Sequence, residues 1–247
     1  MALTKIGKEG ITGISNSSDA NAITITSAEN VGIGTTSPTA ISNYTSVVAN
    51  NSSGSMFELM VGGTRTANIQ TSASQTNIQT RTSIPMVFDT NSTEAMRIDA
   101  NGIITKPLQP AFSAKVTTQQ SNIATSTQVT VPFATELYDQ NSDYNNSTYT
   151  FTAPVTGKYQ LNVLLLLANV DSASSYYQTA LVTSNRTYYQ TIDPRGFSQD
   201  VVYLNLDVSV LADMDAGDTA IVRIYQATGT AQTDLDAETY FTGYLVA

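Results

Sequence analysis

The side chains that could carry out chemistry in this chain are carboxylates, hydroxyls, amides and a few basic groups. Its 247 residues include no Cys, no His and no Trp. Catalytic triads, thiol nucleophiles, disulfides and imidazole or thiolate metal sites are therefore excluded. An enzyme would have to work with carboxylates, Lys, Tyr, Ser or Thr alone. The carboxylate pairs Asp234/Asp236 and Glu136/Asp139 are interpreted as loop residues, because spacing alone cannot set the separation that glycoside hydrolysis needs. We predict no enzyme and no cofactor.

One acidic segment could bind a cation. Asp213, Asp215 and Asp218 place three carboxylates within six residues, and Ca²⁺ takes roughly six to eight oxygen ligands. The segment lacks the ligand pattern of a calcium-binding hand. We therefore favour a solvated acidic turn and predict no metal, keeping these three residues as the candidate calcium ligands.

Two tyrosine pairs lie in polar sequence, Tyr176-Tyr177 and Tyr188-Tyr189. An exposed tyrosine offers a rigid aromatic surface and a hydroxyl, which suits recognition of a glycan or a protein. Neighbouring residues of a strand point to opposite faces, so one of each pair is expected in a core. These four residues are the candidate receptor contacts.

The charge of the chain is strongly acidic and unevenly distributed. The net charge is −9. Residues 1–108 contain seven acidic and six basic residues, whereas 109–247 contain thirteen and five. An acidic surface repels phosphate backbones, so we predict no nucleic-acid partner. The change in composition predicts two parts with different roles.

No segment has the character of an export signal or a membrane span. The first ten residues lack the apolar stretch of a signal peptide. The longest apolar run, 163–168, is too short to cross a bilayer. We expect no membrane insertion.

Residues 1–108 are rich in Ser, Thr, Asn and Gly, with short alternating stretches at 22–26, 68–71 and 77–80. Such stretches are typical of β-strands. The composition is compatible with disorder, but the recurring apolar residues favour a β-rich shaft in which three chains share one core. We predict an attachment arm at 1–30 and a trimeric stem at 31–108.

Two segments of this part carry a sharper signal. They are Glu29-Asn30-Val31-Gly32-Ile33-Gly34-Thr35-Thr36-Ser37-Pro38 and Glu94-Ala95-Met96-Arg97-Ile98-Asp99-Ala100-Asn101-Gly102-Ile103. Together they resemble a module junction of tailed-phage fibre and virion-surface proteins. A nucleotide-binding loop is a weaker interpretation, since Gly32 and Gly34 are followed by no third glycine and no predicted helix.

The C-terminal part, 109–247, has the pattern of a β-sandwich. Pro107 and Pro110 favour an extended linker before it. Stretches rich in β-branched and aromatic residues then recur without any helical pattern, which predicts an all-β, antiparallel jelly-roll sandwich. The expected strands are 112–118, 128–133, 148–152, 157–169, 176–184, 187–191, 200–211, 219–227 and 239–246. Gly243, inside the last strand, is expected where another chain segment approaches closely.

The tract 159–168 begins as an alternating strand and then becomes apolar on both faces. One set of its residues can face the internal core, namely Leu161, Val163, Leu165 and Leu167. The other set, Leu164, Leu166 and Ala168, needs a second cover. We favour a subunit interface near a symmetry axis over a loop of the same chain.

The C-terminal part, 109–247, which we call the head, shows a second resemblance. Four segments follow one another in the order seen in one family. They are Phe112-Ser113-Ala114, Phe151-Thr152-Ala153-Pro154-Val155-Thr156-Gly157-Lys158-Tyr159, Gly217-Asp218 and Thr239-Tyr240-Phe241-Thr242-Gly243-Tyr244-Leu245. They resemble the trimeric jelly-roll heads of the complement component-one-q and tumour-necrosis-factor superfamily. The resemblance implies a homotrimer that binds other molecules and catalyses nothing. The candidate interface and core residues are Tyr159, Leu161, Val163, Leu164, Leu165, Leu166, Leu167, Phe241, Tyr244 and Leu245.

Together these patterns predict a structural protein on the virion surface of a tailed phage. We expect a homotrimeric tail fibre whose arm docks on other tail or capsid proteins and whose head contacts a host glycan or protein. A capsid decoration protein is the alternative within this class. A glycan-depolymerising tailspike and a bacterial adhesin rank lower.

Overall fold

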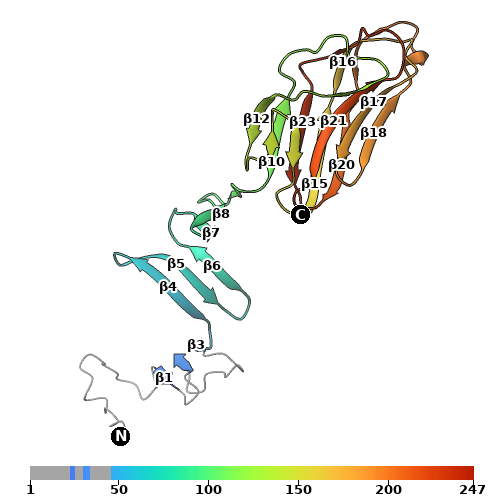
Figure 1. The fold of residues 1–247 in the computed structure, drawn as a ribbon. Coiled ribbons are helices and arrows are strands. Elements are labelled where there is room, and N and C mark those ends of the chain that lie inside the picture. Colours follow the sequence, from blue (N-terminus) through green and yellow to red (C-terminus); the bar gives the residue numbers. More distant parts are fainter. Residues whose placement is uncertain (1–22, 26–29, 34–45) are drawn as a thin grey trace, which may run out of the picture. The chain divides into compact units, whose positions relative to one another are not determined.

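A computed structural model describes residues 23–25, 30–33 and 46–247 of the chain (Figure 1). The chain divides into two compact units, Met1–Val87 with Arg97–Ile104 and Phe88–Met96 with Thr105–Ala247. The described residues form β-strands and one short 3₁₀ turn, Pro194–Gly196, which confirms the all-β prediction. No helix among them is long and apolar enough to span a membrane. Most of the predicted arm at 1–30 lies outside the described residues.

The head is a sandwich of two antiparallel sheets (Figure 1). The first sheet has five strands in the order β12 (Thr135–Asp139), β10 (Ala111–Lys115), β23 (Tyr240–Leu245), β15 (Gly157–Leu164) and β20 (Val208–Met214). The second has the order β13 (Tyr144–Asn145), β14 (Thr150–Thr152), β21 (Thr219–Gln226), β17 (Tyr177–Thr183) and β18 (Thr187–Ile192), with β11 (Gln128–Thr130) also on β21. A small third sheet consists of β19 (Val201–Asn205), β16 (Leu166–Val170) and β22 (Asp234–Leu235).

An aromatic cluster forms the centre of the core between the two large sheets. Phe112 is fully buried and stacks on Tyr144 and Phe151, with ring centroids 5.0 and 4.8 Å apart. Phe241 forms a T-shaped pair with it, with ring centroids 4.9 Å apart. A Cβ at Gly243 would come within 2.6 Å of Phe112, which confirms the close approach predicted at this glycine. These rings come from both sheets and hold them together.

The leucine tract differs from the single strand that was predicted for it. β15 ends at Leu164, and β16 begins at Leu166 in the small third sheet. At the break, the backbone N–H of Leu165 donates to Asp207 Oδ1 at 3.1 Å and that of Leu166 to Thr239 Oγ1 at 3.0 Å. Ala168 is buried by its own chain, so the predicted subunit contact is wrong for this residue. Alternation cannot continue through a crossover between two sheets.

Other differences in the head have the same origin. The predicted strand 200–211 is also divided, into β19 on β16 and β20 on β15. The strands β12, β13 and β22 were not predicted. Two of these have only two residues each, too few for a period-two pattern to appear in the sequence.

The part before the head consists of short strands in three-stranded sheets. They are β1 (Ile23–Ile25), β2 (Val31–Ile33), β3 (Val47–Ala49), β4 (Ser55–Val61), β5 (Thr64–Thr71), β6 (Thr76–Thr80), β7 (Met86–Thr90), β8 (Thr93–Ile98) and β9 (Ile104–Thr105). The three predicted stretches coincide with β1, β5 and β6. Between β8 and β9, Gly102 has a φ of 86°, and Asp99 Oδ1 accepts the backbone N–H groups of Asn101 and Ile103. This half of the junction motif therefore forms a turn.

The sheet β4–β5–β6 has one apolar face. Phe57 pairs with Ile69, and Ile69 with Ile78, so that these three side chains form one row across the sheet. All three are at least half exposed. The neighbouring row, which points to the opposite face, is polar and consists of Glu58, Asn68 and Gln79. Such a sheet resembles half of a sandwich whose second layer is missing.

Candidate functional site: the outer face of the five-stranded sheet

The outer face of the five-stranded sheet carries rows of side chains that alternate in character. The first row runs from Ala111 through Tyr244 and Gln160 to Leu211. Strand register places these residues side by side on one face, because every second residue of a strand points the same way. The side chain of Tyr244 is 49% exposed and that of Leu211 is 56% exposed. This row is therefore a surface that another molecule could cover with a gain in free energy.

The second row is small and polar. It consists of Ser113, Thr242, Asn162 and Ser209. Asn162 Oδ1 accepts from Gln160 Nε2 at 2.9 Å and from Ser209 Oγ at 2.8 Å. The hydrogen bonds fix these polar side chains across β15 and β20. Short, mutually bonded side chains let a partner approach the sheet closely.

The third row carries charge beside an aromatic ring. Lys115 pairs with Tyr240, which in turn lies opposite Leu164, a residue that is 43% exposed. Lys115 Nζ lies 5.4 Å from the centre of the Tyr240 ring and 3.3 Å from Glu238 Oε1. Tyr240 Oη donates to Glu238 Oε2 at 2.5 Å. This hydrogen bond, followed by the Lys115 ammonium, holds the pKa of Glu238 below its ordinary value.

We expect Tyr240→Phe to raise the pKa of Glu238 toward its ordinary value, because the substitution removes the hydrogen bond that lowers it most. The folded pKa is depressed, so this carboxylate stabilises the fold above its unfolded pKa and loses that effect as pH falls through its folded pKa. An NMR titration of side-chain carboxyl carbons measures the shift. Tyr138→Phe, on the same face, serves as the control, and an unchanged Glu238 titration would contradict the assignment.

The predicted interface and core residues separate into three groups. The fully or almost fully buried ones belong to the core of a single chain: Tyr159, Leu161, Val163, Leu165, Leu167 and Phe241. This confirms the predicted internal core position of Leu161, Val163, Leu165 and Leu167. Leu164 and Tyr244 are exposed on the outer face, and Leu166 and Leu245 are half-buried.

The structure also separates the predicted receptor contacts. Tyr177 is fully buried, and its hydroxyl lies 2.6 Å from Thr233 Oγ1, so its role as a contact is wrong. Tyr176 is half-buried against Tyr225, with ring centroids 5.6 Å apart. Tyr188 is half-buried, whereas Tyr189 is 55% exposed. Both line a hollow of about 490 Å³ at the edge formed by β18 and β20.

The candidate calcium ligands bond to groups of the protein. Asp213 pairs with Lys158, with Nζ and Oδ1 2.5 Å apart. Asp218 Oδ2 accepts from Asn185 Nδ2 at 2.8 Å and from the backbone N–H of Asp215 at 2.9 Å. Within the described ranges, no group of three or more acidic, His or Cys side chains is arranged to hold a metal ion.

Two residues of this face were missed by the sequence prediction, Leu211 and Tyr240. Leu211 lay at the end of the predicted strand 200–211, where its outward direction could not be read. Tyr240 follows Thr239 in the predicted last strand, and its alternation with Phe241 was the available signal. Only the pairing of β23 with β10 places it beside Lys115.

Comparisons with known proteins found matches to the head. Residues 111–246 match the model of the C1q domain family. The globular domain of zebrafish complement 1qA protein is similar at 18% identity and a TM-score of 0.41, with 56% of this chain and 98% of that chain covered. Murine APRIL, in a crystal structure at pH 8.0, is similar at 13% identity and a TM-score of 0.42, with 56% of this chain and 99% of that chain covered. No curated protein matches the chain.

Proposed function

This chain belongs to the C1q domain family, and from that premise we propose that it is a homotrimeric fibre protein on the virion surface of a tailed phage. The head is displayed for contact with the host, and the N-terminal arm docks on other tail or capsid proteins. Heads of this family are typically binding or structural domains without catalysis. Three heads on one stem would add avidity to weak individual contacts.

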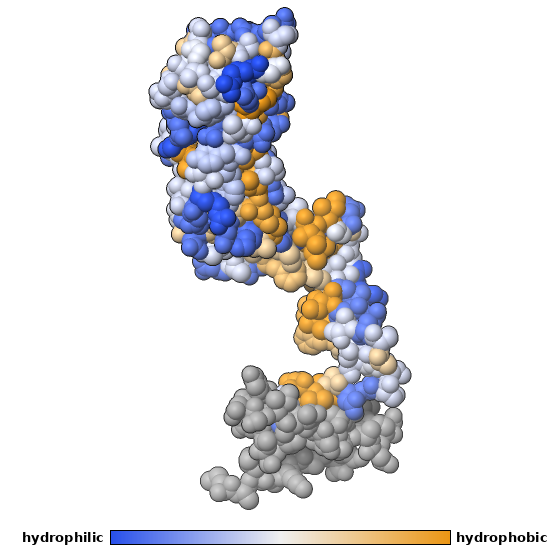
Figure 2. All heavy atoms as spheres, turned by 90° about the vertical axis from the view of Figure 1, so that its right-hand side faces the viewer, coloured by the Kyte–Doolittle hydropathy of each residue, from blue (hydrophilic) through white to orange (hydrophobic). Residues whose placement is uncertain are grey.

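The homotrimer is supported by apolar surface that a single chain leaves exposed. In the head this surface is the row that contains Tyr244 and Leu211. In the part before the head it is the row of Phe57, Ile69 and Ile78 on β4–β6. Figure 2 shows hydrophobic side chains, in orange, on the surface of both units. Large exposed apolar patches mark interaction sites in soluble proteins.

The single observation that carries the proposal is this uncovered apolar row on β4–β6 in a chain that also holds a C1q head. Three copies of such a sheet can enclose a shared core, which one copy cannot build. The virion assignment is further supported by the junction motifs at 29–38 and 94–103, which resemble those of phage fibre proteins.

Electron microscopy of purified particles, labelled with an antibody to the head, tests the location. We expect label on the tail. Label spread over the shell would instead identify a capsid decoration protein, and particles without label would overturn the virion assignment. Release of reducing sugar from host polysaccharide would overturn the non-enzymatic role.

A further inference from the structure

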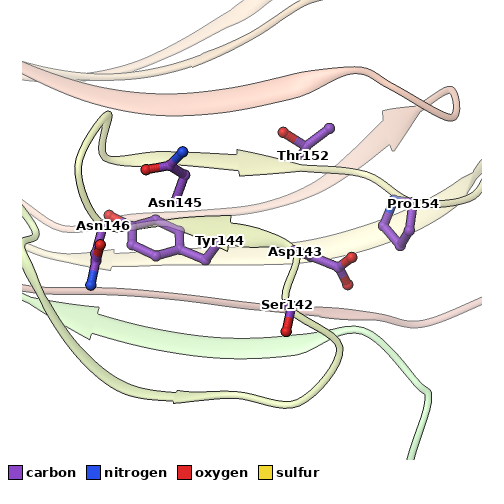
Figure 3. A pocket seen from close by; sticks show the side chains of 7 residues that line it. All are labelled: Ser142, Asp143, Tyr144, Asn145, Asn146, Thr152 and Pro154. Atoms are coloured by element: carbon purple, nitrogen blue, oxygen red, sulfur yellow. The ribbon is translucent and has the colours of Figure 1, made fainter.

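A polar pocket lies in the head beside β13 and β14 (Figure 3). Its volume is about 500 Å³. The pocket is lined by Ser142, Asp143, Tyr144, Asn145, Asn146, Thr152 and Pro154. Figure 3 shows the Asp143 carboxylate directed toward the Pro154 ring. None of these residues was singled out by the sequence as a binding group.

The frame of the pocket is anchored to the core. Tyr144 is buried, its ring stacks on Phe112, and its hydroxyl donates to the carbonyl oxygen of Phe133 at 3.0 Å. The Asp139 carboxylate accepts the backbone N–H groups of Asp143 at 3.1 Å and Tyr144 at 2.8 Å. The backbone N–H of Thr152 donates to the Asp143 carbonyl at 2.8 Å, which joins the two walls. A pocket held in this way needs little ordering when a ligand binds.

Several polar groups of the lining are available to a ligand. Within the described part of the chain, the hydroxyls of Ser142 and Thr152 and the amide of Asn146 make no side-chain hydrogen bond that would occupy them. The Asp143 carboxylate accepts only from Asn141 Nδ2, at 3.1 Å to each oxygen, which leaves lone pairs on both. Burial raises the pKa of Asp143. A carboxylate that is partly withdrawn from water forms stronger hydrogen bonds than one in bulk solvent.

The character of these groups selects one class of ligand. No Lys or Arg lines the pocket and one carboxylate does, so anions are disfavoured. A single carboxylate is too few for a divalent cation. An ammonium group only donates, so it would leave the donors of Asn146 and Thr152 without partners. A sugar hydroxyl both donates and accepts, and therefore fits the mixture of groups that is present.

We propose that this pocket binds a neutral sugar unit, with Asp143 as the acceptor and Asn146 and Thr152 as donors to its hydroxyls. Pro154 provides an apolar surface for the carbon face of the ring. Sugar binding by this pocket depends on the proposed function only for the source of the sugar. On the virion surface that source would be a glycan of the host. The pocket lies within one head and uses none of the outward rows of the five-stranded sheet.

Saturation-transfer NMR on the full chain tests the proposal, with glucose, galactose and N-acetylglucosamine as neutral probes. Putrescine and methylphosphonate, which both carry non-exchangeable protons, serve as the cationic and anionic probes. We expect transfer to at least one neutral sugar and none to the charged probes. The double variant N146A/T152V should weaken that binding by about tenfold, because two hydrogen bonds to the ligand are lost.

Thr148→Val is the matched control, since it removes a hydroxyl from the same hairpin but outside the lining. It should leave binding unchanged. Asp143→Asn is a second variant of the pocket and should weaken binding at an unchanged melting temperature. The proposal is overturned if no neutral sugar shows transfer, if a charged probe binds instead, or if N146A/T152V binds as the wild type does.

The test separates this inference from the proposed function. A virion protein that binds no neutral sugar overturns the pocket alone. A sugar-binding protein that is missing from the particles overturns the virion role alone.

Discussion

Replacing Phe112 with alanine should lower the free energy of unfolding of the head by about 3–5 kcal/mol. The ring is fully buried and contacts three other aromatic rings, those of Tyr144, Phe151 and Phe241. Its removal loses the transfer free energy of the side chain and leaves a cavity that β-sheets on both sides cannot close. Because a domain of this size is stable by only about 5–15 kcal/mol, we expect a large fall in melting temperature.

Denaturant unfolding of the full chain, followed by tyrosine fluorescence, measures this effect. Phe197→Ala is the matched control, because it removes the same ring from a position that is 40% exposed. The control should cost much less than the core substitution. Equal losses in the two variants would show that Phe112 is not at the centre of the core.

The double substitution L211D/Y244D should dissociate the proposed homotrimer. Wild-type protein is expected at three times the chain mass of 26.3 kDa, and the variant at that mass itself. The two side chains flank Gln160 in one outward row of the five-stranded sheet. Contact with another subunit would bury two unpaired carboxylates per chain there, at a cost of about 3–5 kcal/mol each. Each chain contributes this row, so the cost is incurred three times.

Light scattering coupled to size-exclusion chromatography reads the mass directly. Val202→Asp is the control, because Val202 is 64% exposed on β19, outside the five-stranded sheet. This variant should keep the wild-type mass. A wild-type protein that is already a monomer would reject the homotrimer. An L211D/Y244D variant that remains a trimer would show that the β4–β6 row, and not this face, holds the three chains together.

The sequence by itself determined the chemistry that the protein lacks and the class of its fold. The absence of Cys and His excludes whole groups of sites, whatever the fold is. Period-two patterns located most strands of the head, because alternation depends only on neighbouring residues of one strand. Gly243 was predicted at a close approach, and Phe112 and Leu161 lie against it.

Tertiary structure decided where the strands break and which outward-facing side chains a neighbouring segment covers. The tract 159–168 looked like one strand with two apolar faces, but the chain crosses there from one sheet to another. Tyr177 and Tyr189 belong to similar pairs in the sequence, and one is buried while the other is exposed. The pocket beside β13 joins residues 142–146 to 152–154 through strand pairing. Burial and the meeting of distant residues depend on long-range pairing, and a local pattern contains no information about it.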